Sequence, residues 1–92
     1  MTSGAIARRI SEKLSRAFVP ERLEIIDESH LHKGHAGHHP EGESHFRIHI
    51  VSGAFVNKRA VERHRMVNRI LAEELAGRVH ALALELRAPG ED

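Results

Sequence analysis

The sequence contains no cysteine, tryptophan or tyrosine, and phenylalanine occurs only three times. Without a thiol, the chain forms no disulfide scaffold, no cysteine-based zinc finger and no thiol nucleophile. The scarcity of aromatic rings argues against a platform on which nucleic-acid bases stack. Any site for a soft metal must therefore use histidine or share thiolates supplied by a partner.

Long apolar runs are also missing. No stretch approaches the roughly 20 apolar residues that a membrane-spanning helix needs. The charged residues Arg8, Arg9, Glu12 and Lys13 interrupt the segment where a signal peptide would have its apolar region. A length of 92 residues predicts a single domain over residues 1–92. We therefore expect a one-domain cytoplasmic protein.

Histidine is the abundant residue. The chain has nine histidines, and its net charge at pH 7 is only +1 when they are neutral. Since the ordinary histidine pKa is about 6.5, the net charge depends strongly on pH in the physiological range. Neutral imidazole is also a common ligand of zinc, copper, nickel and iron. Histidine is therefore the residue type on which a functional hypothesis can rest.

The apolar pattern predicts the first half of the fold. Ile6, Ile10 and Leu14 recur at helical spacing after the candidate N-caps Thr2 and Ser3. A short strand is expected over residues 23–26. Residues 29–43 have no period and contain five histidines, which predicts a long variable loop.

The second half begins with the strongest strand signal. Over residues 45–50, apolar side chains alternate with polar ones, which predicts a strand with one buried face. Helical spacing follows over residues 61–75 and ends near Gly77. Alternating leucines over residues 82–86 predict a last strand, and residues 88–92 are expected to form a frayed tail. This order predicts a two-layer α+β domain with a three-stranded sheet.

Catalytic motifs are missing from the sequence. There is neither a Gly-x-Ser-x-Gly turn nor a glycine-rich phosphate loop. The acid pairs Glu73–Glu74 and Asp27–Glu28 are adjacent, so their members do not share a helix or strand face. We interpret them as solvated charge and expect no enzyme.

The histidines divide into groups by their surroundings. The loop histidines either bind metal or belong to a solvated tract. The alternation places His45 and His49 on the polar face of a strand, where surface residues are usual. His64 on a helix is typical of a solvated or capping residue, and strand parity places His80 on the leucine side, where a half-buried histidine is usual. The loop histidines are His30, His32, His35, His38 and His39.

A basic segment precedes and enters the second predicted helix. Arg59 and Arg63 are i,i+4 neighbours on a helix, as are Arg65 and Arg69. Such a segment either contacts phosphates or forms a solvated helix face. Its members are Lys58, Arg59, Arg63, His64, Arg65 and Arg69.

Four segments, taken in order, resemble the BolA family. The resemblance extends from about residue 20 to residue 86, and the first predicted helix is also in place. The segments are LEIIDES at 23–29, GESHFRI at 42–48, VERHRMVN at 61–68 and VHALAL at 79–84.

The resemblance implies a fold similar to the class II KH domain. That fold is a three-stranded mixed sheet with helices packed on one face, in the order α-β-β-α-α-β. It implies a short extra helical turn near residues 58–61, before the main helix. Asn57 stands where the family commonly has glycine, and asparagine tolerates the left-handed conformation. The family's C-terminal extension with a tryptophan is absent.

The resemblance also implies a function. BolA-like proteins are partners of monothiol glutaredoxins, and the pair holds a bridging [2Fe–2S] cluster. The glutaredoxin supplies a cysteine and a bound glutathione thiol, and the BolA side supplies histidines. The family pattern matches His80 and, in the loop, His35, with His32 and His38 in reserve. The resemblance implies cluster storage, sensing or delivery, no cofactor when the chain is alone, and a monomer or weak homodimer in the apo form.

A DNA-binding transcriptional regulator is the alternative. Its motivating features are the KH-like fold and the Arg63-His64-Arg65 segment. The Gly-x-x-Gly clamp that KH domains place on a nucleic-acid backbone is not found at the expected helix junction, which weighs against this alternative.

Overall fold

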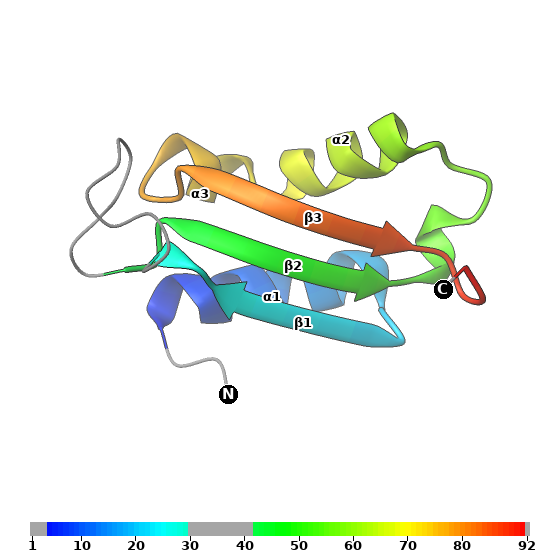
Figure 1. The fold of residues 1–92 in the computed structure, drawn as a ribbon, viewed down its shortest axis with the longest axis horizontal. Helices are drawn as coiled ribbons and strands as arrows, with labels where there is room; N and C mark the ends of the chain where they lie inside the picture. The colour runs from blue at the N-terminus through cyan, green and yellow to red at the C-terminus, as the bar shows by residue number, and fades with distance from the viewer. Residues whose placement is uncertain (1–3, 30–41, 92) are drawn as a thin grey trace.

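A computed structural model describes residues 4–29 and 42–91. The order of the elements agrees with the expected α-β-β-α-α-β arrangement (Figure 1). The elements are α1 (Ala5–Phe18), β1 (Arg22–Asp27), β2 (His45–Val51), the 3₁₀ turn η2 (Gly53–Phe55), α2 (Ala60–Ile70), α3 (Ala72–Ala76) and β3 (Ala81–Arg87).

The three strands form one mixed sheet in the order β1-β2-β3. β1 runs antiparallel to β2, with Ile25 opposite Ile48, and β3 runs parallel to β2, with Leu84 opposite Ile48. All three helices lie on the same side of the sheet (Figure 1). Because β2 and β3 are parallel, they start at one end of the molecule and finish at the other. The predicted mixed sheet and single helical layer are confirmed.

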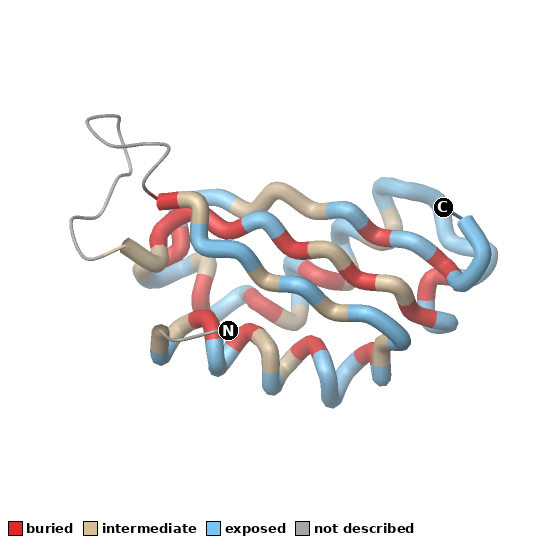
Figure 2. Tube along the Cα trace, turned by 60° about the horizontal axis from the view of Figure 1, so that its bottom comes forward, coloured by how far each residue is buried: buried red, intermediate tan, exposed pale blue. Residues whose placement is uncertain are grey.

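The core lies between the helices and the inner face of the sheet (Figure 2). The alternation in β2 has the predicted effect, because Phe46, Ile48 and Ile50 are buried. Burying a side chain of this size stabilises the fold by about 1.5–3 kcal/mol. In the helical layer, the fully buried residues of the same core are Ile10 and Leu14 of α1, Val67 of α2, and Leu71 between α2 and α3.

The N-terminus of α1 differs from the prediction. The candidate caps Thr2 and Ser3 lie outside the described residues, and the N-cap position is Gly4, which has no side-chain cap. A carboxylate oxygen of Glu43, Oε2, accepts hydrogen bonds from the Ile6 and Ala7 amides instead, at 2.7 and 3.1 Å. A distant acidic residue therefore takes the place of the local hydroxyl that the sequence suggested.

The second helical segment is broken where the sequence predicts continuity. Leu71, with φ −100° and ψ 21°, separates α2 from α3. The short helix of the α-α pair therefore follows the main helix α2 and does not precede it. The extra turn expected near residues 58–61 is not there: α2 begins at Ala60, and the 3₁₀ turn lies earlier, at Gly53–Phe55. Asn57 has φ +64°, the left-handed conformation that asparagine tolerates and for which the family commonly has glycine.

Glu74 and the C-terminal residues 88–91 also differ from the prediction. Glu74 is not solvated: its side chain is only 2% exposed, and it lies 3.1 Å from Arg9 and 2.9 Å from Lys13 of α1. Residues 88–91 are not frayed, because Ala88 is buried and the Glu91 carboxylate binds Arg63. None of the helices in the described part of the chain combines the length and the apolar character needed to cross a membrane.

Candidate metal-ligand site at the base of the histidine loop

His80 lies between α3 and β3 and has an exposed imidazole on a fixed backbone. The main-chain N–H of His80 donates to the Ser44 carbonyl at 2.7 Å, and the main-chain N–H of Ala81 donates to the same oxygen at 3.3 Å. Val79, just before it, is buried. The prediction that His80 would be half-buried by strand parity is wrong, because β3 begins at Ala81 and the alternation does not reach His80.

A buried group of hydroxyls lies directly behind this backbone. The Ser29 hydroxyl oxygen accepts hydrogen bonds from the main-chain N–H groups of Ser44 and His45, at 2.9 and 3.2 Å. The Ser44 hydroxyl donates to the Ser29 oxygen at 3.2 Å and lies 2.9 Å from Nδ1 of His45. These residues are each at most 5% exposed. The network joins the end of β1 to the starts of β2 and β3.

His45 is buried, which contradicts the expectation of a surface residue on the polar face of β2. The reason is tertiary: its ring lies beside the ring of His80, with centroids 5.2 Å apart and planes tilted by 50°. In the sheet register His45 is opposite Ala81, so parallel pairing brings the two histidines to the same edge. The alternation of apolar and polar residues in the sequence could not predict that His45 lies beside His80.

The base of the loop is held by further contacts. The Asp27 carboxylate accepts from the N–H of Ser29 and from the N–H of Glu43, both at 2.9 Å. On the other side, the guanidinium of Arg78 donates to the Gly42 carbonyl, with its shorter contact at 2.8 Å. Both flanks of segment 30–41 are therefore fixed beside the backbone that carries His80. Asp27 was interpreted as solvated charge, but it organises this base.

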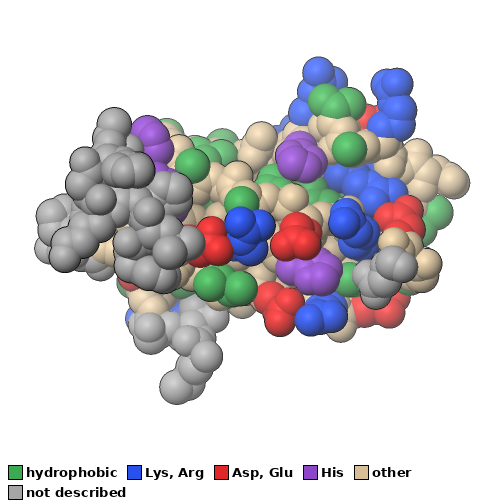
Figure 3. Space-filling model, in the orientation of Figure 1, with side chains coloured by type: hydrophobic (Ala, Val, Ile, Leu, Met, Phe, Trp, Pro, Cys, Tyr) green, Lys and Arg blue, Asp and Glu red, His purple; other side chains and the backbone are tan. Residues whose placement is uncertain are grey.

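The remaining histidines are distributed differently. The loop histidines, including the expected ligand His35 and its reserves His32 and His38, lie outside the described residues. His49 faces outward from β2, with Nδ1 3.4 Å from the Glu24 carboxylate, within the row of charged side chains on the outer face of the sheet (Figure 3). His64 is exposed on α2. In residues 4–29 and 42–91, no group of three or more potential ligands could hold a metal ion by itself.

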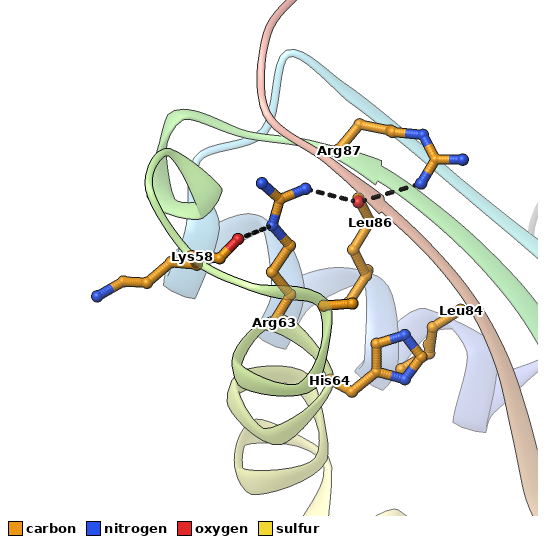
Figure 4. A pocket seen from close by; sticks show the side chains of 7 residues that line it. Lys58, Arg63, His64, Leu84, Leu86 and Arg87 are labelled. Atoms are coloured by element: carbon orange, nitrogen blue, oxygen red, sulfur yellow. Dashed lines mark hydrogen bonds between the residues drawn. The ribbon is translucent and has the colours of Figure 1, made fainter. Parts of the chain in front are cut away.

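Members of the basic segment line two cavities beside α2. Lys58, Arg65 and Arg69 line a cavity of about 260 Å³ along α2, together with Glu62 and Met66. Arg63 and His64 line a second cavity, of about 250 Å³, between α2 and the end of β3 (Figure 4). Lys58 lines both cavities, so it connects the two groups of basic side chains.

Two of these arginines already have acidic partners. The guanidinium Nε of Arg59 lies 3.6 Å from Glu62, whose carboxylate also accepts from the Arg59 N–H at 2.9 Å. That hydrogen bond lowers the pKa of Glu62 below its usual value. Arg63 forms a bidentate pair with Glu91. Sequence reasoning did not reveal this second pair, because it joins residues far apart in the chain.

Comparison with a protein-family model described as BolA-like protein gives a match over residues 14–91. The chain belongs to the BolA-like family. This agrees with the resemblance carried by the four sequence segments. It extends that resemblance to the C-terminal residues after β3.

Individual proteins and a solved structure are also similar to this chain. The chain is 51% identical over 88 residues to an uncharacterized Sinorhizobium protein from the cobS 5′ region, covering 95% of each chain. It is also 51% identical over 79 residues to the DNA-binding transcriptional regulator BolA of Escherichia coli, covering 86% of this chain and 71% of that protein. The solved BolA domain of SufE1 from Arabidopsis thaliana is similar with a TM-score of 0.89 and 40% identity, covering 99% of this chain and 100% of that one.

Proposed function

We propose that this BolA-like chain is a non-enzymatic cytoplasmic partner of a monothiol glutaredoxin. In the complex, its histidines and the partner's thiols would together bind a bridging [2Fe–2S] cluster. The observation that carries the proposal is the exposed imidazole of His80 on a fixed backbone, in a chain without cysteine. The proposed role is the storage, sensing or delivery of the cluster.

The surroundings of His80 suit a ligand shared between two proteins. His80 is exposed, so a partner can approach its imidazole. The hydrogen bond of 2.7 Å from the main-chain N–H of His80 to the Ser44 carbonyl holds the backbone that carries this ring. The neighbouring ring of His45 restricts the space that the imidazole can occupy. Such restriction lowers the entropy lost when a partner binds.

The second histidine is proposed to come from segment 30–41. Ser29, which precedes this segment, is bonded to Ser44, and so is the main-chain N–H of His80. Gly42, which follows the segment, accepts a hydrogen bond from Arg78. A chain can extend about 3.3–3.6 Å per residue, so a histidine in the middle of such a segment has enough reach. His35 is the proposed ligand because the family pattern matches it, and His32 and His38 are the reserves.

The donor chemistry is consistent with a shared set of ligands. The imidazoles come from this chain, and the thiolates come from the glutaredoxin cysteine and from glutathione. Histidine ligation of a [2Fe–2S] cluster is known from Rieske centres, where it raises the reduction potential. The bound cluster would supply a one-electron couple or a transferable iron–sulfur unit.

Reconstitution with a monothiol glutaredoxin tests this proposal. The pair is mixed with iron, sulfide and glutathione, and the visible circular dichroism spectrum is recorded for the wild type and for His80→Ala. The matched control is His64→Ala, which removes another exposed histidine. The proposal requires that only His80→Ala changes the spectrum of the mixed complex, and an unchanged spectrum would rule out His80 as a ligand. Replacing His35, His32 and His38 in turn identifies the loop ligand.

DNA binding is a second candidate, supported by a different observation. A relative 51% identical to this chain is named a DNA-binding transcriptional regulator. Lys58, Arg65 and Arg69 line one cavity along α2, where basic side chains can meet a phosphate backbone. A gel-shift titration with salt tests this candidate. Sequence-specific binding persists at physiological salt, whereas a weak and uniform shift that salt abolishes reflects non-specific charge.

A further inference from the structure

The guanidinium of Arg63 is oriented by two carbonyl groups at the end of the sheet opposite His80. Nε donates to the Lys58 carbonyl at 2.9 Å, and Nη1 donates to the Leu86 carbonyl at 3.1 Å (Figure 4). The arginine side chain is only 12% exposed. One carbonyl lies in the segment just before α2 and the other in β3, so these two parts of the chain together fix the plane of the guanidinium. This is the preorganised fork that recognises carboxylate and phosphate groups.

A carboxylate of the same chain already occupies this fork. Glu91 accepts from Nη1 and Nη2 of Arg63 at 2.6 and 2.9 Å, and its Oε1 also accepts from the Ala88 N–H at 2.8 Å. The hydrogen bonds from Arg63 and then from Ala88 are the main causes that lower the pKa of Glu91 to about 2. Three donors therefore converge on one pair of oxygen atoms. Glu91 itself is 40% exposed, so a competitor from solvent can reach the same donors.

The charge around the fork exceeds that of one carboxylate. The cavity beside it, of about 250 Å³, is lined by Lys58, Arg63, His64 and Arg87 together with apolar residues, and no acidic side chain is in this lining. Arg87 points toward the same Leu86 carbonyl as Arg63, with Nη1 at 3.4 Å (Figure 4). The one negative charge of Glu91 thus meets two cationic side chains, Arg63 and Arg87. A dianion matches the positive charge of these surroundings better than a carboxylate does.

We propose that Arg63, Arg87 and the Ala88 N–H form a binding site for a phosphate dianion, which Glu91 closes as an intramolecular competitor. The ligand is inorganic phosphate or the phosphate of a monoester, since both present three oxygen atoms and two negative charges. Glu91 stays ionised at neutral pH, so the site opens by anion exchange and not by protonation. This site is separate from the His80 region, and the proposed partnership with a glutaredoxin does not depend on it.

A phosphate titration followed by nuclear magnetic resonance tests the site. The Arg63 Nε–Hε and Ala88 N–H signals are recorded in a phosphate-free buffer at constant ionic strength, while inorganic phosphate is added to the wild type and to Glu91→Gln. If Glu91 closes the site in about nine molecules of ten, its removal increases the apparent phosphate affinity about tenfold. The matched control Glu85→Gln removes an acidic side chain from the outer face of the sheet and leaves the affinity unchanged.

Two further variants make the assignment specific. Arg87→Gln in the Glu91→Gln background keeps the Arg63 contacts and should weaken phosphate binding several-fold. Arg63→Lys in the same background removes the bidentate fork and should abolish binding, with thermal unfolding confirming that the variant folds. The proposal is overturned if Glu91→Gln binds phosphate no more tightly than the wild type, or if Arg87→Gln leaves the affinity of Glu91→Gln unchanged. A parallel titration with methyl phosphate identifies the source, because tighter binding than inorganic phosphate favours a monoester.

Discussion

The two ends of the parallel β2–β3 pair hold their polar side chains in opposite ways. At the start of the strands, the polar side chains of Ser29, Ser44 and His45 are almost fully buried and bonded to one another. At the other end, Arg63 and Glu91 form a charged pair with one partly exposed member. A buried hydrogen-bond network is costly to break because its groups are left without partners, whereas an accessible ion pair can exchange its partner for another anion. The first end suits the positioning of a ligand residue, and the second suits anion exchange.

The largest expected effect is at the buried network. Ser29→Ala removes the acceptor of the Ser44 and His45 amides and leaves both groups buried without it. We expect the free energy of unfolding to fall by about 2–3 kcal/mol, measured by chemical denaturation. The control is Ser15→Ala, on the exposed face of α1, which should change the stability very little. Equal effects of the two changes would contradict a structural role for the buried network.

The Glu43 cap tests the same end of the sheet. Glu43→Ala removes the acceptor of the Ile6 and Ala7 amides, and we expect a loss of about 1–2 kcal/mol in unfolding free energy. Hydrogen exchange of these two amides should accelerate more than that of the central amides of α1. Glu12→Ala, on the exposed side of the same helix, is the control. If exchange at Ile6 and Ala7 stays at the wild-type rate, Glu43 does not cap the helix.

The opposite end contains a strained residue that can be relieved. Val19 ends α1 with φ +41°, a left-handed conformation that is unfavourable for a β-branched residue, and its side chain is 81% exposed. Val19→Gly should therefore raise the unfolding free energy by about 1 kcal/mol, measured by denaturation. The control is Val56→Gly, also exposed but with φ −60°, which should lower it. A loss of stability in Val19→Gly would show that this backbone is not strained.

The smallest expected effect is on the Arg63–Glu91 pair, and it depends on pH. Arg63, with help from the Ala88 N–H, lowers the pKa of Glu91 from 4.5 to about 2, so these contacts contribute to stability above pH 4.5. This contribution is lost as the pH falls toward 2. Carbon-detected titration of the Glu91 carboxyl group measures the pKa directly, and Arg63→Lys should raise it toward 4.5. A wild-type pKa near 4.5 would mean that the pair does not form in solution.

Much of the fold was predictable from local patterns. The alternation in β2 and the four-residue spacing in α1 gave the correct elements, and the family segments gave the mixed sheet. The break at Leu71 was not predictable, because its amide still donates to the Val67 carbonyl and its side chain continues the apolar stripe. The Glu43 cap and the buried Glu74 were also missed, since both depend on contacts with α1 from distant parts of the chain.

The candidate site was only partly predictable. The family pattern singled out His80, but its exposure and its neighbour His45 follow from the parallel register of β2 and β3. Sequence parity failed for both histidines because they lie at strand ends, where the alternation no longer determines burial. The pairing of Arg63 with Glu91 was missed for another reason: a charge near the end of a chain gives no local signal of its partner.

The Glu43 cap has a consequence for the order of folding. The residue that completes the first turn of α1 is 37 positions away from Ile6 in the sequence. A helix of 14 residues is marginal in water by itself, and this one begins without a local side-chain cap. The early nucleus is therefore expected to include the β1–β2 pairing, which brings Glu43 into place. α1 would then reach full helicity late, although it precedes both of these strands in the chain.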